Sequence, residues 1–390
     1  MNSFPAGAII MGGHFHSLGA VRSLGRKGVQ VVLLDYENNI SRFSKYISRF
    51  HKCPEYHFEE PLLRTIIRLV LKYNYNGWVI FPSDDESVYF LSKYHKILSR
   101  YLKVSIPPWN ISQHVYNKKN TYQKAESLAI PIPRTYYPAC PENLDDIDIK
   151  FPAVIKPAVM RSFFKITHKK VFRVTDGTAL RKYYEEACQC ICQEEILLQE
   201  EIPSAADHLY SFCPFFKDSR PVSYIIAKRH RQHPLDYGQA STYAETVDCP
   251  ELVELGTQFL SSIDFYGICE VEFVFDQRDK TFKLLEVNPR IWGWHTLSEA
   301  SGVDLLYQFF LDMIGMRTTQ QVYRKGVHWI RLLTDVPTAI IALFKRRLPL
   351  KTYLNQIFGP KEYAVLSWDD PIPFLMDLTL APYYWAKRGF

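Results

Sequence analysis

Apolar runs and amphipathic stretches alternate through the first hundred residues of this chain. An apolar run at 8–11 is followed by an amphipathic stretch at 18–27 and a second apolar run at 29–34. Residues 78–81 supply a further buried strand. This alternation favours an α/β fold, in which helices cover both faces of a parallel sheet. Ligands of such a sheet bind at the carboxyl ends of its strands.

Two polar segments follow predicted strands at that edge. Gly12 begins a glycine pair after the first strand, but the G-x-G-x-x-G spacing of a dinucleotide site is absent. Further along, Ser83 and Glu86 have the spacing of a helix capping box, which would make the segment a structural helix start. The alternative is that Asp84 or Asp85 binds a substrate amine, and we assign this role to Asp85.

Basic residues recur in the middle of the chain. A proline-rich joint at 106–109 precedes a basic, helix-like segment at 117–128. A β-rich run at 151–157 contains Lys156, and a strand fixes the direction of such a side chain. The alternative for Lys156 is an exposed lysine on an edge strand.

A strand-like segment at 224–231 carries two arginines. The two-residue period of a strand places Arg229 and Arg231 on one face. Two guanidinium groups on one face suit a phosphate or a carboxylate, although a solvated basic edge is the alternative. We expect Arg231 to act in catalysis and Arg229 to bind substrate.

Two apolar runs joined by a short polar segment predict a β-hairpin over residues 268–288. Alternation places Glu270 and Glu272 on one face of the first strand, and Glu286 and Asn288 on one face of the second. Concentrated carboxylates are unfavourable without a cation, and hard oxygen ligands suit Mg²⁺ held against nucleotide phosphates. We therefore predict Glu272, Glu286 and Asn288 as magnesium ligands. A solvated hairpin with incidental acids is the alternative.

Arg290 follows the hairpin directly after Pro289. A guanidinium group in this place would neutralise the charge that develops on a transferred phosphoryl group. We therefore predict a catalytic role for Arg290.

Composition and charge argue against several classes of protein. The chain has 47 basic and 41 acidic residues, and its net charge of +6 is too mild and too evenly spread for a nucleic-acid-binding protein. A hydrophobic content of 47% and an aromatic content of 15% argue against disorder. The cysteines at 188, 190 and 192 lack the spacing of a zinc site, so reduced thiols are expected.

No membrane or export signal is evident in the sequence. The first residues lack the basic start and long apolar stretch of a signal peptide. The apolar stretch at 339–344 is far shorter than the roughly 20 residues that a membrane helix requires, so it packs in a core or against a membrane-associated partner. We expect a cytoplasmic protein.

The order of these motifs resembles the ATP-grasp superfamily of carboxylate-activating ligases. The segment at 117–128 is similar to the first lysine segment of the family, and the run at 151–157 is similar to its second lysine strand. Residues 198–203 resemble the hinge strand whose backbone binds adenine, and the hairpin matches the metal positions. The resemblance implies ATP as cofactor, bound by Lys118, Lys156, Lys170, Gln199, Glu200, Glu201, Ile202 and Asp207, and Mg²⁺ bound at the positions assigned above.

One segment departs from the pattern of the family. The usual glycine-rich phosphate loop is missing, and residues 159–170 replace it. Basic side chains such as Lys169 or Lys170 would then clamp phosphates in place of the backbone. A purely structural basic loop is the alternative.

The resemblance also implies a domain organisation. A Rossmann-like domain at 1–108 precedes an ATP-grasp domain at 109–315, which contains a small α+β lid at about 150–203 and a carboxyl-terminal catalytic subdomain. Residues 316–390 are expected to form a helical, aromatic extension that packs on the catalytic body. The segments at 288–293 and 300–304 are most similar to carboxylate–amine ligases of the D-aspartate ligase type.

The function implied by this resemblance is ATP-dependent amide or peptide bond formation. A carboxylate is activated as an acylphosphate and captured by an amine, with an amino acid among the small-molecule substrates. Transfer to a thiol, kinase-like phosphorylation and a non-catalytic nucleotide-binding regulator are the alternatives. The aromatic-basic end could instead dock a partner or a lipid-linked or polymer acceptor. The sequence names neither the donor nor the acceptor, and it leaves the oligomeric state open.

Overall fold

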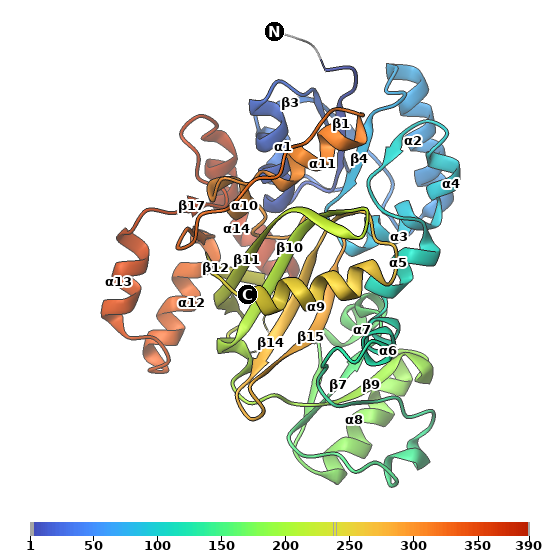
Figure 1. Ribbon diagram of the computed structural model, residues 1–390, viewed down its shortest axis with the longest axis vertical. Coiled ribbons are helices and arrows are strands. Elements are labelled where there is room, and N and C mark those ends of the chain that lie inside the picture. Colours follow the sequence, from blue (N-terminus) through green and yellow to red (C-terminus); the bar gives the residue numbers. More distant parts are fainter. Residues whose placement is uncertain (1–3, 237, 239, 389–390) are drawn as a thin grey trace.

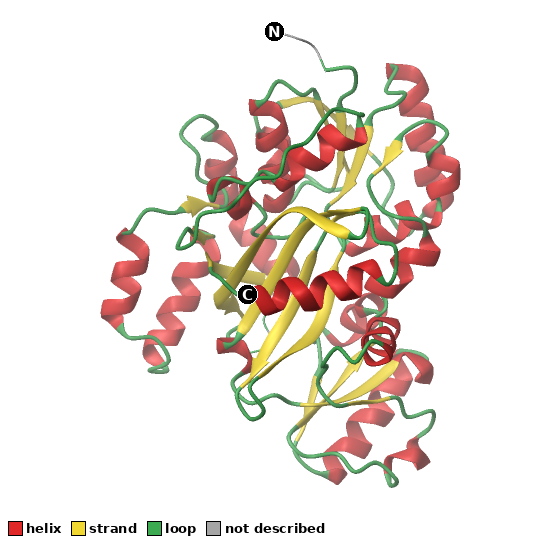
Figure 2. Cartoon of the chain, in the orientation of Figure 1, coloured by secondary structure: helices red, strands yellow, loops and turns green. Residues whose placement is uncertain are grey.

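The computed structural model describes residues 4–236, 238 and 240–388, and the strands within this part of the chain form three sheets (Figure 1). The parallel sheet lies at one end of the molecule, the large central sheet lies in the middle, and the small sheet lies at the other end (Figure 2).

The parallel sheet has the strand order β3-β2-β1-β4-β5. Successive side chains of β1 point to opposite faces, so Ile10 shares a core with α1 and Ile9 shares a core with α2. Helices therefore cover both faces, which confirms the predicted α/β fold. The elements are β1 (Ala8–Met11), α1 (Phe15–Arg26), β2 (Val31–Asp35), η1 (Ile40–Phe43), β3 (Ile47–Lys52), α2 (Glu59–Tyr73), β4 (Val79–Pro82), α3 (Asp85–Lys93), α4 (His95–Leu98) and β5 (Lys103–Val104).

The central sheet has the order β15-β14-β10-β11-β12-β16-β17, and β13 pairs with β10. Helix α9 covers one face, where its Phe259 shares a core with Phe212 and Phe273 of the sheet. The other face packs towards α1, since Phe215 and Leu18 belong to one core. The elements are β10 (Leu209–Lys217), β11 (Arg220–His233), β12 (Ala240–Thr246), α9 (Pro250–Ser261), β13 (Gly267–Ile268), β14 (Glu270–Asp276), β15 (Thr281–Asn288), β16 (His328–Ile330) and β17 (Glu362–Tyr363).

The small sheet has the order β6-β9-β7-β8 and packs with α7 and α8 around a core of its own. It has the α+β composition predicted for the lid, and α5 and α6 connect it to the parallel sheet. The elements are α5 (Trp109–Tyr116), α6 (Lys118–Ser127), β6 (Thr135–Tyr136), η2 (Pro141–Leu144), β7 (Ala153–Pro157), α7 (Met160–Thr167), β8 (Phe172–Val174), α8 (Gly177–Cys190), η3 (Gln193–Glu195), β9 (Ile196–Glu200) and η4 (Ala205–Asp207).

The carboxyl-terminal part of the chain contains both helices and strands. Strand β16 pairs with β12 and β17 pairs with β16, so this part extends the central sheet. Sequence analysis anticipated helices and aromatic packing here but not these strands. No helix among the described residues is long and apolar enough to cross a membrane. The remaining elements are α10 (Thr296–Ala300), α11 (Leu305–Met313), α12 (Leu332–Phe344), α13 (Leu350–Phe358) and α14 (Ile372–Arg388).

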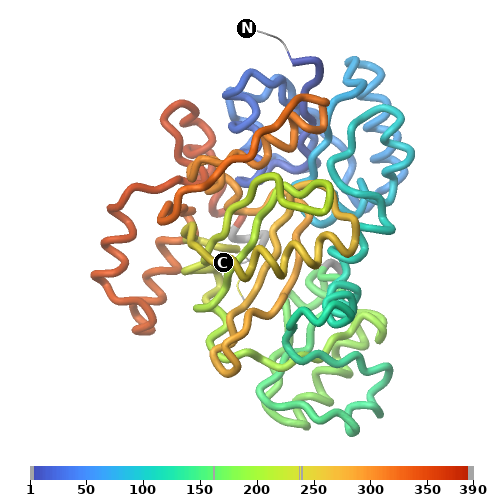
Figure 3. The backbone as a smooth tube through the Cα atoms, in the orientation of Figure 1, coloured from blue at the N-terminus to red at the C-terminus, as the bar shows by residue number. Residues whose placement is uncertain are grey.

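A buried ion pair ties the carboxyl-terminal segment to the parallel sheet, beside which this segment returns (Figure 3). Arg22 Nε on α1 lies 3.0 Å from Asp370 Oδ2, and these residues are only 4% and 1% exposed. Arg26, one turn further along α1, forms a more exposed pair with Asp369 at 2.9 Å.

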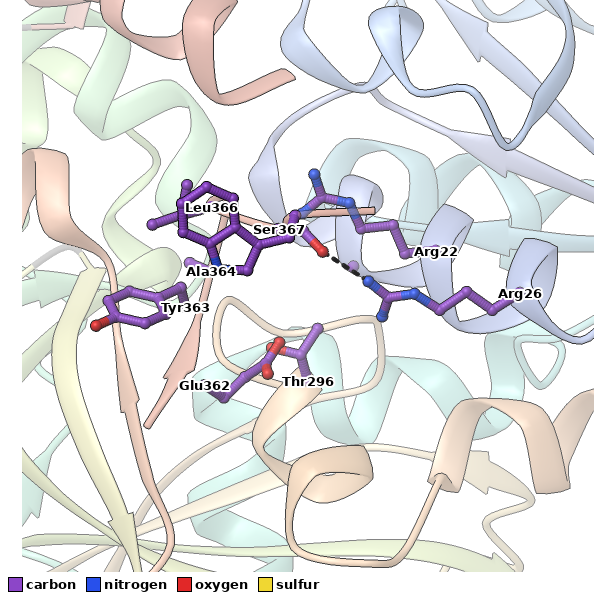
Figure 4. Close-up of a pocket in the computed structure, with 10 residues that line it drawn as sticks. Arg22, Arg26, Thr296, Glu362, Tyr363, Ala364, Leu366 and Ser367 are labelled. Carbon is purple, nitrogen blue, oxygen red and sulfur yellow. Dashed lines mark hydrogen bonds between the residues drawn. The ribbon is translucent and has the colours of Figure 1, made fainter. Parts of the chain in front are cut away.

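A small cavity of about 150 Å³ lies beside these ion pairs, where α1 meets residues 362–368 (Figure 4). Arg26 donates to Ser367 Oγ at 2.8 Å across it. Because the arginines that line it are held in ion pairs, the cavity belongs to the junction between the two ends of the chain.

Asp370→Ala should lower the free energy of unfolding by about 3 kcal/mol, because it leaves Arg22 buried without its carboxylate. Asp369→Ala removes an exposed pair and should cost about 1 kcal/mol or less. Denaturant unfolding of the two variants beside the wild type measures the difference. Equal losses of stability would contradict the structural role of the buried pair.

Candidate active site

The carboxylates of the predicted hairpin face each other across β14 and β15. Glu270 pairs with Asn288 and Glu272 pairs with Glu286, which confirms the predicted hairpin and its alternation. Glu270 and Glu272 are buried, with 4% and 8% of their surface exposed. Asn288 Nδ2 donates to Glu272 Oε1 at 3.0 Å and to Glu270 Oε2 at 3.3 Å. Four oxygen-bearing side chains therefore form one cluster.

A register shift next to Glu272 joins this cluster to α6. Phe273 pairs with Leu284, so Leu285 is an extra residue on β15. The carbonyl oxygen of Leu285 accepts a hydrogen bond from Tyr122 on α6 at 2.7 Å. The irregularity thus fixes α6 against the hairpin beside the carboxylates.

Basic side chains from separate elements surround the cluster. Lys118 Nζ, at the start of α6, lies 2.8 Å from Glu286 Oε2. Arg229 Nη2 on β11 lies 2.8 Å from Glu272 and 3.5 Å from Glu270. These positive charges therefore lie in direct contact with the carboxylates.

The pKa values of the three carboxylates differ in direction, because nearby cations offset burial to different extents. Burial, together with the neighbouring Glu272, raises the pKa of Glu270 to about 8. Burial likewise raises the pKa of Glu272. Burial alone would raise the pKa of Glu286, but Lys118 and Lys170 hold it well below its usual range. A further cation would be stabilised between these groups.

The oxygen atoms of this cluster are of the kind that binds Mg²⁺. Among the described residues, no three His, Cys, Asp or Glu side chains converge as a complete metal cage. Mg²⁺ is commonly held by one or two carboxylates, with phosphate oxygens and water completing its shell. Glu272 and Glu286 supply such a partial set of oxygens, and Asn288 would join it by turning its amide oxygen from Arg290 to the metal. The assignment of these residues as metal ligands therefore stays a prediction that the chemistry of the cluster supports.

Lys156 lies within the lid sheet and is only 9% exposed. Its Nζ lies 2.6 Å from the hydroxyl of Tyr122 and 2.7 Å from Gln199 Oε1. Burial, with a contribution from Lys118, lowers the pKa of Lys156 to about 7. Strand β7 has β9 on one side and β8 on the other, so the alternative of an exposed edge-strand lysine is wrong.

The expected hinge connects the lid sheet to the central sheet. The side chains of Glu200 and Glu201 bind Arg278 at 2.6 Å and Arg173 at 2.7 Å. Ile202 is buried, whereas Asp207 lies on the surface in η4. These contacts leave adenine binding by the hinge backbone, and ribose binding by Asp207, as predictions.

Arg290 links the hairpin to the carboxyl edge of the parallel sheet. Its Nε lies 2.6 Å from Asp85 Oδ1 at the start of α3, and its Nη2 donates to Asn288 Oδ1 at 3.1 Å. Asp85 therefore orients Arg290, and amine binding by Asp85 stays a prediction.

The cap of α3 differs from the predicted Ser83–Glu86 box. Asp84 is the N-cap residue, and its side chain accepts from the backbone N–H of Ser87 at 2.7 Å. Ser83 Oγ instead donates to the carbonyl of Met11 at 2.6 Å. The helix starts one residue later than the spacing predicted, because Asp84 and Ser87 satisfy the same geometry.

The prediction that Arg231 shares a face with Arg229 is wrong. Arg229 pairs with Ala244, but Arg231 pairs with Tyr243, so a bulge at His230 reverses the alternation. Arg231 Nε instead forms a buried pair with Asp335 of α12 at 2.9 Å. The geometry gives Arg231 a structural role in place of the catalytic role that we assigned to it.

The segment that replaces the glycine-rich loop is a helix rather than an extended loop. Residues Met160–Thr167 form α7, and His168 ends it in a left-handed conformation. Lys170 Nζ then donates to the carbonyl of Gly238 at 2.8 Å, between β11 and β12. Lys170 therefore links the lid to the central sheet. Its positive charge lowers the pKa of Glu286 and opposes the burial that raises the pKa of Glu272.

Sequence analysis missed three residues that complete these contacts. Tyr122 lies one helical turn after Lys118, and this i, i+4 spacing was a usable signal. Ser211 donates to Glu270 at 3.0 Å, and Thr135 accepts from Gln199 at 2.6 Å. The latter two are brought into place only by strand pairing, which one sequence does not reveal.

A family model and solved structures show which known proteins share this fold and the segment that contains the carboxylate cluster. Residues 228–314 match the family described as "Carbamoyl-phosphate synthase L chain, ATP binding domain", a region that contains the hairpin and the second part of β11. The solved structures similar to the chain have the ATP-grasp fold. The fold of the chain is therefore that of ATP-grasp enzymes, which agrees with the resemblance.

Three individual proteins are similar to this chain over most of its length. D-aspartate ligase of Enterococcus faecium (strain Aus0004) is 22% identical over 307 residues, which cover 72% of this chain and 70% of the relative. L-amino acid ligase from Bacillus licheniformis has a TM-score of 0.61 at 15% identity, covering 80% of this chain and 75% of that one. N5-carboxyaminoimidazole synthetase from Staphylococcus aureus, complexed with ADP, has a TM-score of 0.67 at 15% identity, covering 89% and 87%.

Lys156 should titrate near pH 7, well below an ordinary lysine. The carbon atom next to its amine, followed by NMR in lysine-labelled protein, reports this pKa. Lys118→Met should raise it, because the variant removes a nearby positive charge. Lys119→Met is the matched control, since Lys119 Nζ donates to the carbonyl of Glu194. An ordinary lysine pKa in the wild type would contradict the burial of the amine.

Proposed function

We propose that this protein is an ATP- and Mg²⁺-dependent carboxylate–amine ligase. The observation that carries the proposal is the cluster of the buried Glu270 and Glu272 with the half-buried Glu286 and Asn288, at which cations are directed. A nucleotide polyphosphate with Mg²⁺ matches this arrangement, because the metal suits the carboxylates and the phosphates suit the surrounding cations.

Each part of the site has a role in this proposal. Lys118 and Lys156 bind phosphates, and the backbone of 199–202 binds adenine. Bound Mg²⁺ would neutralise phosphate charge and orient the terminal phosphate. Arg290, held between Asp85 and Asn288, stabilises the negative charge of the phosphoryl group during transfer. Catalysis is then mainly positioning and charge neutralisation.

The proposed reaction has two steps. A carboxylate oxygen of the first substrate attacks the γ-phosphorus of ATP, so that ADP leaves and an acylphosphate forms. An amine then attacks the acyl carbon, an amide forms, and phosphate leaves with one oxygen from the original carboxylate. Arg229, now paired with Glu272 at 2.8 Å, is the cation that we assign to the substrate carboxylate.

An amino acid is the proposed substrate class. The relatives named D-aspartate ligase and L-amino acid ligase support this choice, and both resemble the chain over most of its length. The chain thus carries the machinery for joining an amino acid to another small molecule through an amide bond.

An oxygen-tracing experiment tests the reaction. The protein is incubated with ATP, Mg²⁺ and amino acids labelled with ¹⁸O in their carboxylates, alone and in pairs. Released phosphate should contain one ¹⁸O atom per amide formed, as measured by mass spectrometry. A phosphorylated product without free phosphate would indicate a kinase, and tight ATP binding without any ADP release would indicate a regulator.

Arg290→Ala should lower turnover about 10²- to 10³-fold, because it removes one electrostatic donor to the transition state. The effect should fall on kcat, with little change in the KM for ATP. Arg220→Ala, at the exposed start of β11, is the control and should keep wild-type turnover. Full activity of Arg290→Ala would rule out the assigned role.

A further inference from the structure

Helices α12 and α13 lie side by side at one edge of the molecule, away from the lid (Figure 1). The inner face of α12 is buried through Ala339 and Ala342, which pack towards the central sheet. Its opposite face carries Val336, Ile340 and Phe344 at four-residue spacing, and these are 37%, 45% and 86% exposed. The helix is therefore apolar on the side that faces solvent as well as on the buried side.

Helix α13 has the same arrangement. Its Tyr353 is buried, whereas Leu350, Leu354 and Phe358 recur at four-residue spacing and are 59%, 43% and 83% exposed. A stripe of this kind differs from scattered surface hydrophobics, which are normal on soluble proteins. Contiguous exposed apolar surface marks a site of interaction.

The charged residues within the segment 336–361 have one sign. Residues 336–361 contain no aspartate or glutamate. The turn between the helices is exposed and carries Lys345, Arg346 and Arg347, and Lys351 follows at the start of α13. Arg347 is paired with Asp236 at 2.8 Å. The turn thus places cations directly beside the exposed Phe344 and Leu350.

We propose that the α12–α13 hairpin docks this protein on the surface of a membrane that contains anionic lipids. Exposed aromatic and aliphatic side chains next to a basic turn are the features of helices that lie in the interface of a bilayer. Anionic headgroups complement the turn, while Phe344, Leu350 and Phe358 enter the boundary between headgroups and acyl chains. The protein binds peripherally, and neither helix spans the bilayer.

A second copy of the chain is a poorer occupant of this surface. Two-fold pairing of the hairpin would place two basic turns in one interface, and residues 336–361 contain no acidic side chain to offset their charge. A lipid surface instead supplies negative charge and an apolar layer at the same place.

Vesicle sedimentation with the full-length protein tests the proposal. The protein should sediment with vesicles of phosphatidylcholine and phosphatidylglycerol but not with phosphatidylcholine alone, and raised salt should weaken binding. Phe344→Ser/Phe358→Ser should weaken binding about tenfold, the effect of losing roughly 1.4 kcal/mol. Lys345→Glu/Arg346→Glu should also weaken binding, with the loss confined to anionic vesicles.

Leu71→Ser/Lys72→Glu on α2 is the matched control, because it changes one exposed apolar and one exposed basic residue on another helix. It should bind as the wild type does. Thermal melting shows whether each variant is folded. Absence of sedimentation with anionic vesicles, or equal sedimentation of hairpin and control variants, would overturn the proposal. A hairpin-dependent dimer without vesicle binding would overturn it in favour of self-association.

Discussion

The repulsion between two opposed carboxylates is the constraint around which this structure is organised. Glu272 and Glu286 are cross-strand partners on the hairpin, where like charges destabilise a sheet unless cations offset them. Lys118 comes from α6, Arg229 from β11 and Lys170 from the end of the lid. The cluster is therefore stable only when separate parts of the chain converge on it.

Because cations from separate elements surround the carboxylates, one site can bind both a nucleotide and its metal ion. Lys118 and Arg229 bind the carboxylates directly. In the proposed complex, the carboxylates would hold Mg²⁺, and phosphates would become the partners of Lys118 and Arg229. Lys156 has a lowered pKa because burial and Lys118 disfavour its charge, so a phosphate nearby would favour the charged amine. The cationic side chains thus keep the site assembled and prepare it for a polyanion.

How much of the fold and of the site could be predicted from the sequence depended on how regular each strand is. Period-two alternation was enough to place Glu270 and Glu272 on one face of β14, and Glu286 and Asn288 on one face of β15, because each strand is regular over these residues. The same rule failed for Arg231, where a bulge at His230 changes the face to which the side chain points. The three-residue strand β16 was too short to give a pattern, although it extends the central sheet. Bulges and long-range pairings depend on tertiary packing, and one sequence does not display that packing.

Binding of Mn²⁺ as a magnetic substitute for Mg²⁺ tests the central claim most directly. The electron paramagnetic resonance signal of protein-bound Mn²⁺ is recorded with and without a non-hydrolysable ATP analogue. The account predicts a nucleotide-dependent signal in the wild type that is lost in a folded Glu272→Gln/Glu286→Gln variant. An unchanged signal in that variant, with the nucleotide still bound, would contradict the claim that these carboxylates hold the metal.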